Sequence, residues 1–143
     1  MRVNLPSNAD NAEFLRRYAR RLLRDARSAQ PSKILPVMRR IYAAGVFPQR
    51  RLSELYHARA SLLLKHILRT LAVELGYANW ADCKRNVNGQ PASVLDRFQL
   101  DLGAFGDFHQ IWFRNETSAR QWRQQHGGHI VVYGEQAVVM AAA

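Results

Sequence analysis

Apolar residues recur at helical spacing in the first part of the chain. Between residues 10 and 29 they return every three or four positions, without Gly or Pro, and arginines occupy many of the positions between them. At about 100° per residue, this spacing places the two kinds of side chain on opposite halves of a helix. Asp10 followed by Glu13 is typical of a helix start. We therefore expect an amphipathic helix over residues 10–29.

Three further helices are expected before residue 90. The second covers residues 32–44, and Pro36 shortens it or delays its start. The third begins at residue 49–53 and continues to residue 75, with its leucines facing inward. Asn79 is suited to cap a short fourth helix. The first 90 residues are thus predicted to form a helical lobe.

The periodicity changes after the turn-forming run at residues 88–91. Residues 98–102 alternate between apolar and polar as in a strand, although Ser93 is equally suited to cap a short helix, so this segment stays open. The elements expected after it are a strand over 108–114, a helix over 115–125, and strands over 129–133 and 136–140. The chain is therefore predicted to be an α+β protein, with a basic helical lobe in residues 1–90 and a β-α-β-β lobe in residues 91–143, or with both parts in one compact domain.

Positive charge is confined to the helical lobe. The 143 residues have a formal net charge of +10. Residues 1–90 hold 17 Lys and Arg against 6 Asp and Glu, whereas residues 91–143 hold 4 against 5. Such a field attracts polyanions without sequence specificity. Nucleic acid is the first partner that it indicates, followed by an anionic membrane surface or an acidic protein.

Six arginines share one half of the first helix, and we call them the arginine face. Like charges four residues apart repel one another, which makes an anionic partner more favourable than solvation alone. Guanidinium groups also bind phosphates bidentately. The predicted nucleic-acid-binding residues are the arginine face, Arg16, Arg17, Arg20, Arg21, Arg24 and Arg27, and the pairs Arg39, Arg40, Arg50 and Arg51. DNA and RNA are not distinguished by this pattern, and the other interpretation of the face is plain solvation or intramolecular pairing.

The spacing from Ala72 to Gly76 is similar to that of a helix-turn-helix motif. In the helix that would follow, however, the positions that should be apolar hold Asp82 and Arg85. A packed helical corner is therefore the preferred interpretation, rather than a standard recognition helix.

Residues 71–84 contain an Ala and a Leu before Gly76-Tyr77, and then Trp80. This run resembles a short helical module found in various bacterial proteins, including plasmid-borne and other mobile-element ones. The resemblance covers fourteen residues. It implies a bacterial origin and a helical corner held by Tyr77 and Trp80, and it implies no catalytic residue.

The histidines raise the alternative of an enzyme. His126 and His129 flank a Gly pair, but no third ligand stands at a diagnostic spacing, so no metal is expected. A small metal-independent ribonuclease would use His109, His129, Tyr133 and Arg114 as acid, base and phosphate clamp. By alternation, His109 is equally suited to a half-buried core position.

The β-α-β-β lobe is rich in aromatic residues and is predicted to have an open strand edge at residues 136–140. This edge favours a homodimer or a protein partner. A protein-binding module or inhibitor that acts on an acidic protein is therefore the second functional hypothesis.

Several functional classes have no motif in this sequence. It contains no Walker loop, dinucleotide-binding glycine fingerprint or nucleophile elbow, so no cofactor is expected and an enzyme is disfavoured. No apolar run of membrane-spanning length occurs, and no signal-peptide pattern stands at the start. The single Cys83 agrees with a reducing compartment. A cytoplasmic protein with no membrane partner is the resulting expectation.

Overall fold

The computed structural model describes residues 10–106 and 108–141. These residues contain seven α-helices and one three-stranded antiparallel sheet, which confirms the α+β class. They divide into two compact units, one up to Pro91 and one from Ala92 onward.

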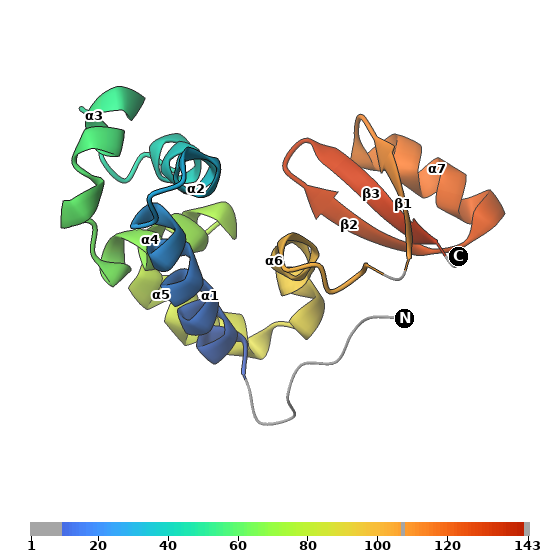
Figure 1. Ribbon diagram of the computed structural model, residues 1–143. Helices are drawn as coiled ribbons and strands as arrows, with labels where there is room; N and C mark the ends of the chain where they lie inside the picture. The colour runs from blue at the N-terminus through green and yellow to red at the C-terminus, as the bar shows by residue number, and fades with distance from the viewer. Residues whose placement is uncertain (1–9, 107, 142–143) are drawn as a thin grey trace. The chain divides into compact units, whose positions relative to one another are not determined.

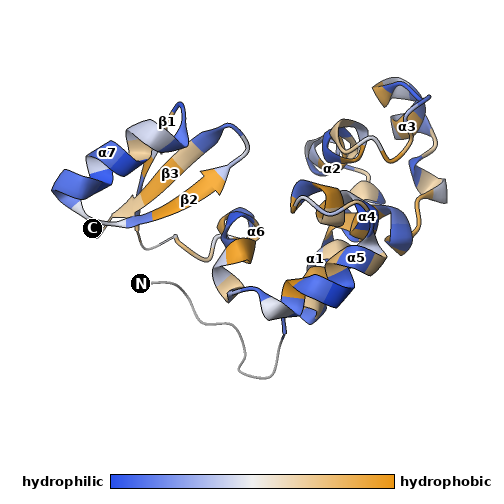
Figure 2. Ribbon diagram, turned by 180° about the vertical axis from the view of Figure 1, so that it is seen from behind, coloured by the Kyte–Doolittle hydropathy of each residue, from blue (hydrophilic) through white to orange (hydrophobic). Residues whose placement is uncertain are grey.

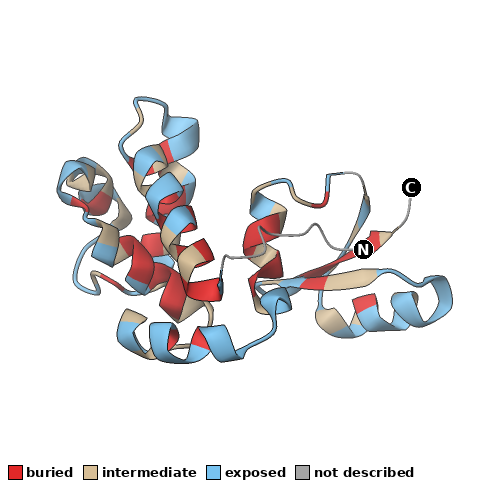
Figure 3. Ribbon diagram, turned by 90° about the horizontal axis from the view of Figure 1, so that it is seen from below, coloured by how far each residue is buried: buried red, intermediate tan, exposed pale blue. Residues whose placement is uncertain are grey.

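The first unit is helical. Its helices are α1 (Asn11–Ala26), α2 (Pro31–Ala43), α3 (Leu52–His57), α4 (Leu64–Glu74) and α5 (Trp80–Asn86). Helix α1 packs against α2 and α4, and α4 packs against α5 (Figure 1). Figure 3 shows that the buried residues lie where these helices face one another. No helix among the described residues has both the length and the apolar character to cross a membrane.

Helix α1 has the predicted start and two distinct faces. The Asp10 Oδ1 atom accepts a hydrogen bond of 2.6 Å from the Glu13 amide, which caps the helix. Its apolar half is buried, with Leu15 and Ala19 fully enclosed. The helix ends at Ala26, three residues earlier than expected. Burial of this half against α2 and α4 stabilises the helix, because a helix of this length is marginal in isolation.

Helix α2 corrects the prediction about Pro36. The helix begins at Pro31, in the first turn, where a missing N–H costs nothing. It then continues through Pro36, which lies exposed within the helix. Ile34 and Met38 are buried on the other side. Their burial offsets the backbone hydrogen bond that Pro36 cannot make.

The prediction of one long third helix that continues to residue 75 is wrong. The chain forms α3, a 3₁₀ turn at Arg59–Ser61 and then the separate helix α4. Between them, Leu62 has an extended backbone and is buried, and Leu63 lies 50% exposed. The Arg27 Nη2 atom donates to the Leu62 carbonyl at 2.9 Å, so the interrupted backbone still has a partner. The break allows α3 and α4 to bury their apolar faces independently.

A tight corner joins α4 to α5. Gly76 has a φ of 92°, and the Gly76 and Tyr77 amides donate to the carbonyls of Val73 and Ala72. This is the pattern of a Schellman cap, which favours Gly because an L side chain strains that backbone. Asn79 then caps α5 by accepting from the Asp82 amide at 2.9 Å. The corner fixes Trp80 at the first position of α5.

The second unit is a sheet covered by helices. Its elements are α6 (Asp96–Asp101), β1 (His109–Phe113), α7 (Glu116–His126), β2 (His129–Tyr133) and β3 (Gln136–Ala141). The sequence favoured neither a strand nor a helix over residues 98–102. The structure has a helix there, because a 3₁₀ turn at Ala92–Leu95 leads directly into α6. The strand order is β1-β3-β2, and both pairs are antiparallel (Figure 1). Helix α7 therefore connects two strands that are separated by β3.

The prediction that residues 136–140 form an open edge of the sheet is also wrong. Strand β3 is the centre of the sheet and has hydrogen-bonded neighbours on both sides. On one face Val138 and Met140 pack with Val131, and on the other Ala137 and Val139 pack with Ala119 of α7. The apolar colour of most of β3 in Figure 2 agrees with this burial on two faces. A continuous apolar run is typical of a strand that is covered on both faces, whereas a strand with one face in solvent alternates.

Candidate nucleic-acid interface

The arginine face of α1 lies on the surface of the helical unit. Arg17, Arg20, Arg21, Arg24 and Arg27 are exposed, and Arg16 is half-buried. Their positions follow from the apolar half of the helix, which is turned toward α2 and α4 and leaves the opposite half to solvent.

The members of this face differ in their contacts. Glu13 lies 3.4 Å from the Arg16 guanidinium and 3.6 Å from that of Arg17. In residues 10–106 and 108–141, no hydrogen bond or ion pair of the side chain is found for Arg20, Arg21 or Arg24. These three guanidiniums retain their full capacity to bind phosphates.

Arg40 is built into the fold. Its Nε and Nη2 atoms donate to the two carboxylate oxygens of Glu74 at 2.9 and 2.7 Å, and its Nη1 atom donates to the Tyr18 hydroxyl at 2.8 Å. Burial lowers the pKa of Arg40, but the hydrogen bonds and charge of Glu74 outweigh it and raise the pKa above its usual value. Arg40 thus links α2 to α4 and α1, and we leave it out of the interface.

The other predicted arginines lie on the surface. Arg39, Arg50 and Arg51 are exposed. The Arg50 guanidinium lies over the Phe47 ring, 5.7 Å from its centroid. This contact places Arg50 beside a hollow that the sequence did not indicate.

The hollow lies between the α2–α3 loop, α4 and the start of α5. It has a volume of about 550 Å³, and we call it the Trp80 hollow. Its lining residues are Val46, Phe47, Lys65, His66, Arg69, Asn79, Trp80 and Ala81. Among the described residues, no carboxylate lines it. It therefore combines aromatic side chains with uncompensated positive charge, as nucleic-acid-binding surfaces do.

One contact connects the Trp80 hollow with α1. The Arg16 guanidinium lies over the Trp80 ring, 5.8 Å from its centroid. Trp80 is a lining residue of the hollow, and Arg16 belongs to the arginine face. The arginine face and the hollow therefore meet at this pair.

His66 contributes a hydrogen-bond donor to the Trp80 hollow. Its Nδ1 atom accepts from the Leu63 amide at 3.0 Å, so the proton of the neutral ring is on Nε2. Burial lowers the pKa of His66, and the positive charge of Lys65 lowers it further. The ring is therefore neutral at pH 7 and offers an N–H group without a full charge.

Sequence reasoning missed the hollow, including the two basic residues that could have indicated part of it. Lys65 and Arg69 stand four residues apart and thus on one side of α4. Phe47 comes from a loop and Trp80 from another helix. Their approach to the same place depends on how α4 and α5 pack, which no local pattern encodes.

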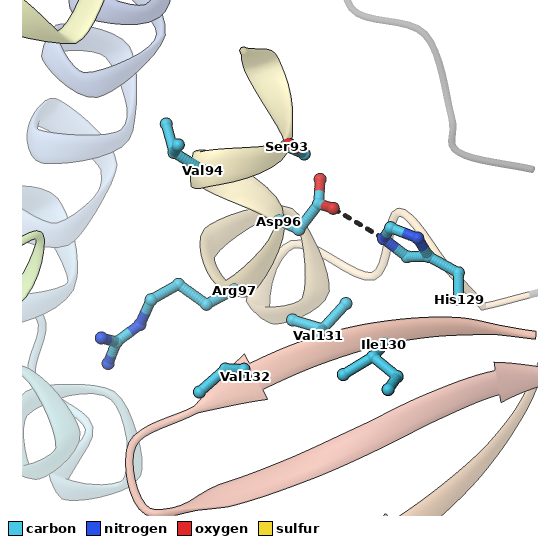
Figure 4. Close-up of a pocket in the computed structure, with 8 residues that line it drawn as sticks. All are labelled: Ser93, Val94, Asp96, Arg97, His129, Ile130, Val131 and Val132. Atoms are coloured by element: carbon cyan, nitrogen blue, oxygen red, sulfur yellow. Dashed lines mark hydrogen bonds and ion pairs between the residues drawn. The ribbon is translucent and has the colours of Figure 1, made fainter. Parts of the chain in front are cut away.

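The second unit has a smaller hollow, shown in Figure 4. It has a volume of about 340 Å³ and lies between α6 and β2. His129 and Asp96 point toward each other in it, with 2.7 Å between Nε2 and Oδ2, while Arg97 points away. The Asp96 side chain is 5% exposed and that of His129 is 40% exposed. A buried carboxylate thus holds this histidine in place.

The residue pair of the ribonuclease hypothesis is not brought together. His109 is opposite Ala141 in the register, and His129 is opposite Met140. Because successive residues of β3 point to opposite faces, His109 and His129 lie on opposite sides of the sheet. His109 is exposed, not half-buried. Within the described ranges, no group of three or more His, Cys, Asp or Glu is arranged to hold a metal ion.

Comparison with known protein families, with curated proteins and with solved structures gives no match for this chain. The resemblance of residues 71–84 to a bacterial helical module therefore stays a prediction.

Proposed function

We propose that the helical unit binds nucleic acid through the phosphate backbone. The observation that carries the proposal is the juxtaposition of the arginine face with the Trp80 hollow at the Arg16–Trp80 contact. Arg20, Arg21 and Arg24 would contact phosphates from α1. Lys65 and Arg69 would extend the contact from α4.

Charge compensation within the unit supports this proposal. The Glu13 carboxylate forms ion pairs with Arg16 and Arg17, and the Glu74 carboxylate forms an ion pair with Arg40. Among the described residues, Arg20, Arg21 and Arg24 have no such ion pair, so their charge is not compensated by a carboxylate contact. Each guanidinium that neutralises a phosphate releases a counterion that was condensed on the nucleic acid, and this release contributes to affinity at low salt.

The experiment measures the salt dependence of binding. Labelled duplex DNA, single-stranded DNA and RNA are titrated with the full chain at about 50 mM and about 200 mM salt. We expect binding that weakens steeply with salt. In an Arg20→Ala/Arg24→Ala variant, the plot of log K against log salt should become less steep. For duplex DNA, the magnitude of its negative slope should decrease by roughly 2, because two phosphate contacts are lost.

A matched control removes the same charge elsewhere. Arg120 and Arg123 lie exposed on α7 in the second unit. Arg120→Ala/Arg123→Ala should keep the slope of the unmodified chain. An equal loss in both variants would mean that net charge alone acts, and no binding to any nucleic acid at low salt would overturn the proposal. Binding to polyglutamate in that case would favour the acidic-protein alternative.

A further inference from the structure

The Trp80 hollow offers aromatic rings at the place where a nucleic-acid backbone would pass. Trp80 and Phe47 both line it, and both are half-buried. We propose that it receives an unpaired base, so that the chain binds single strands in preference to duplex. This inference rests on the proposed function and specifies the substrate class.

Base pairing would prevent the use of these rings. In a duplex, each base is stacked between its neighbours and its π-face is covered. In a single strand, the base is free to turn outward and stack on an aromatic side chain. The volume of the hollow, about 550 Å³, is within the usual range for ligand sites, which runs from about 300 to 1,000 Å³.

Each ring already holds a guanidinium. Arg16 lies over Trp80 and Arg50 lies over Phe47, at 5.8 and 5.7 Å from the ring centroids. A guanidinium that leaves the ring for a phosphate exchanges a cation–π contact for a charge-assisted hydrogen bond. A base that enters the hollow therefore stacks on the ring in place of the guanidinium, and the displaced arginine stays near the backbone of the same strand.

The polar lining consists largely of donors. Lys65 and Arg69 are cationic, and His66 offers Nε2–H. Asn79 uses its Oδ1 atom to cap α5, which leaves its amide N–H groups for a ligand. A lining of donors around aromatic rings suits a base and its phosphate, both of which carry acceptors.

The test distinguishes recognition of a base from attraction to the charge of the phosphate backbone. The chain contains three tryptophans, so Trp112→Phe/Trp122→Phe leaves Trp80 as the only one. This variant is titrated with a thymidine oligonucleotide, an abasic strand of the same length and a duplex, all at one salt concentration. We expect quenching of Trp80 fluorescence by the oligonucleotide but not by the abasic strand, and affinity for the abasic strand that is roughly 5- to 150-fold weaker.

Substitution of the ring gives a second measurement. In the otherwise unmodified chain, Trp80→Leu should reduce the difference between the oligonucleotide and the abasic strand, while Trp80→Phe should retain most of it. Trp112→Leu is the matched control, because Trp112 is 45% exposed and lies in the second unit. It should leave the difference unchanged.

The possible failures are distinguishable. Equal affinity for the oligonucleotide and the abasic strand, without quenching, would overturn base recognition while the proposed phosphate contact stands. Failure to bind any strand at low salt would overturn both. The comparison of the two strands uses Trp80 itself, so it decides the question even if Trp80→Leu does not fold.

Discussion

The Arg40 guanidinium and the Glu74 carboxylate form a two-pronged ion pair that joins α2 to α4, with N–O distances of 2.7 and 2.9 Å. The Arg40 side chain is 21% exposed and that of Glu74 is 14% exposed. The Tyr18 hydroxyl of α1 accepts from the same guanidinium at 2.8 Å. Three helices of the first unit are thus held by one cation.

Removal of one partner of this pair should destabilise the helical unit. We expect Arg40→Met to lower its free energy of unfolding by about 2 kcal/mol or more, because Glu74 is left without its cation in a poorly solvated place. Arg40→Met/Glu74→Leu should recover much of the loss. Denaturant unfolding, followed by Trp80 fluorescence in the Trp112→Phe/Trp122→Phe background, measures both. The exposed neighbour Arg39→Met should change stability by less than about 0.5 kcal/mol.

The lowered pKa of His66 predicts a dependence of stability on pH. Above the ordinary histidine pKa of 6.5, the ring is neutral in the folded and the unfolded chain and contributes no pH dependence. As the pH falls through 6.5, the unfolded chain takes up the proton first, so stability is lost between that value and the lower folded pKa. His66→Gln should make this loss smaller when unfolding is compared at about pH 7.5 and about pH 5.5.

The hydrogen bond to the Leu63 amide gives that experiment a control. Gln at this position retains an acceptor for the amide, whereas His66→Leu does not. His66→Leu should therefore be less stable than His66→Gln at both pH values. An undiminished loss of stability in both variants would show that other groups cause it.

Gly128 has no room for a side chain. A Cβ atom there would lie 2.6 Å from Val139 Cγ1 and 3.0 Å from the Met140 carbonyl oxygen, and its φ is 112°. We expect Gly128→Ala to lower the stability of the second unit by about 3 kcal/mol or more, because strain and overpacking add. Gly134 has a φ of 65° but no atom within 4 Å of a Cβ, so Gly134→Ala should cost only about 1–2 kcal/mol. Unfolding followed by the fluorescence of Trp112 and Trp122, in a Trp80→Phe background, compares them.

Cys83 is suited to report the opening of the helical unit. Its side chain is fully buried, and burial raises the pKa of the Cys83 thiol to about 11. We expect a thiol reagent such as Ellman's reagent to react slowly with the folded chain at about pH 8 and rapidly in denaturant. The denaturant concentration at which reaction begins should match the change in Trp80 fluorescence. Rapid stoichiometric labelling of the folded chain would contradict the burial.

The sequence by itself determined the helices whose ends and faces are written locally. Asp10 and Glu13 place the start of α1, and the spacing of its apolar residues decides which half faces solvent. Asn79 likewise caps α5 as expected, and Asn115 caps α7 at the start of the helix expected over residues 115–125. In each case the determining atoms lie within one or two turns of the chain.

Tertiary packing decided the elements whose local signals conflict. The leucines between residues 52 and 75 suit one long helix, but burial of Leu62 in an extended segment divides it. Residues 98–102 alternate as a strand does, yet Phe98 is buried within α6. Burial against other elements outweighs intrinsic propensity in such segments.

One part of the candidate interface is determined by the local sequence, and the other part is determined by tertiary packing. The arginine face could be predicted because a single amphipathic helix carries it. The Trp80 hollow could not, since Phe47, Lys65, Arg69 and Trp80 come from a loop and two helices. The role of Arg40 was likewise decided by Glu74, which is thirty-four positions away. Local periodicity tells which residues are exposed, but only the packing of distant elements tells which exposed residues meet.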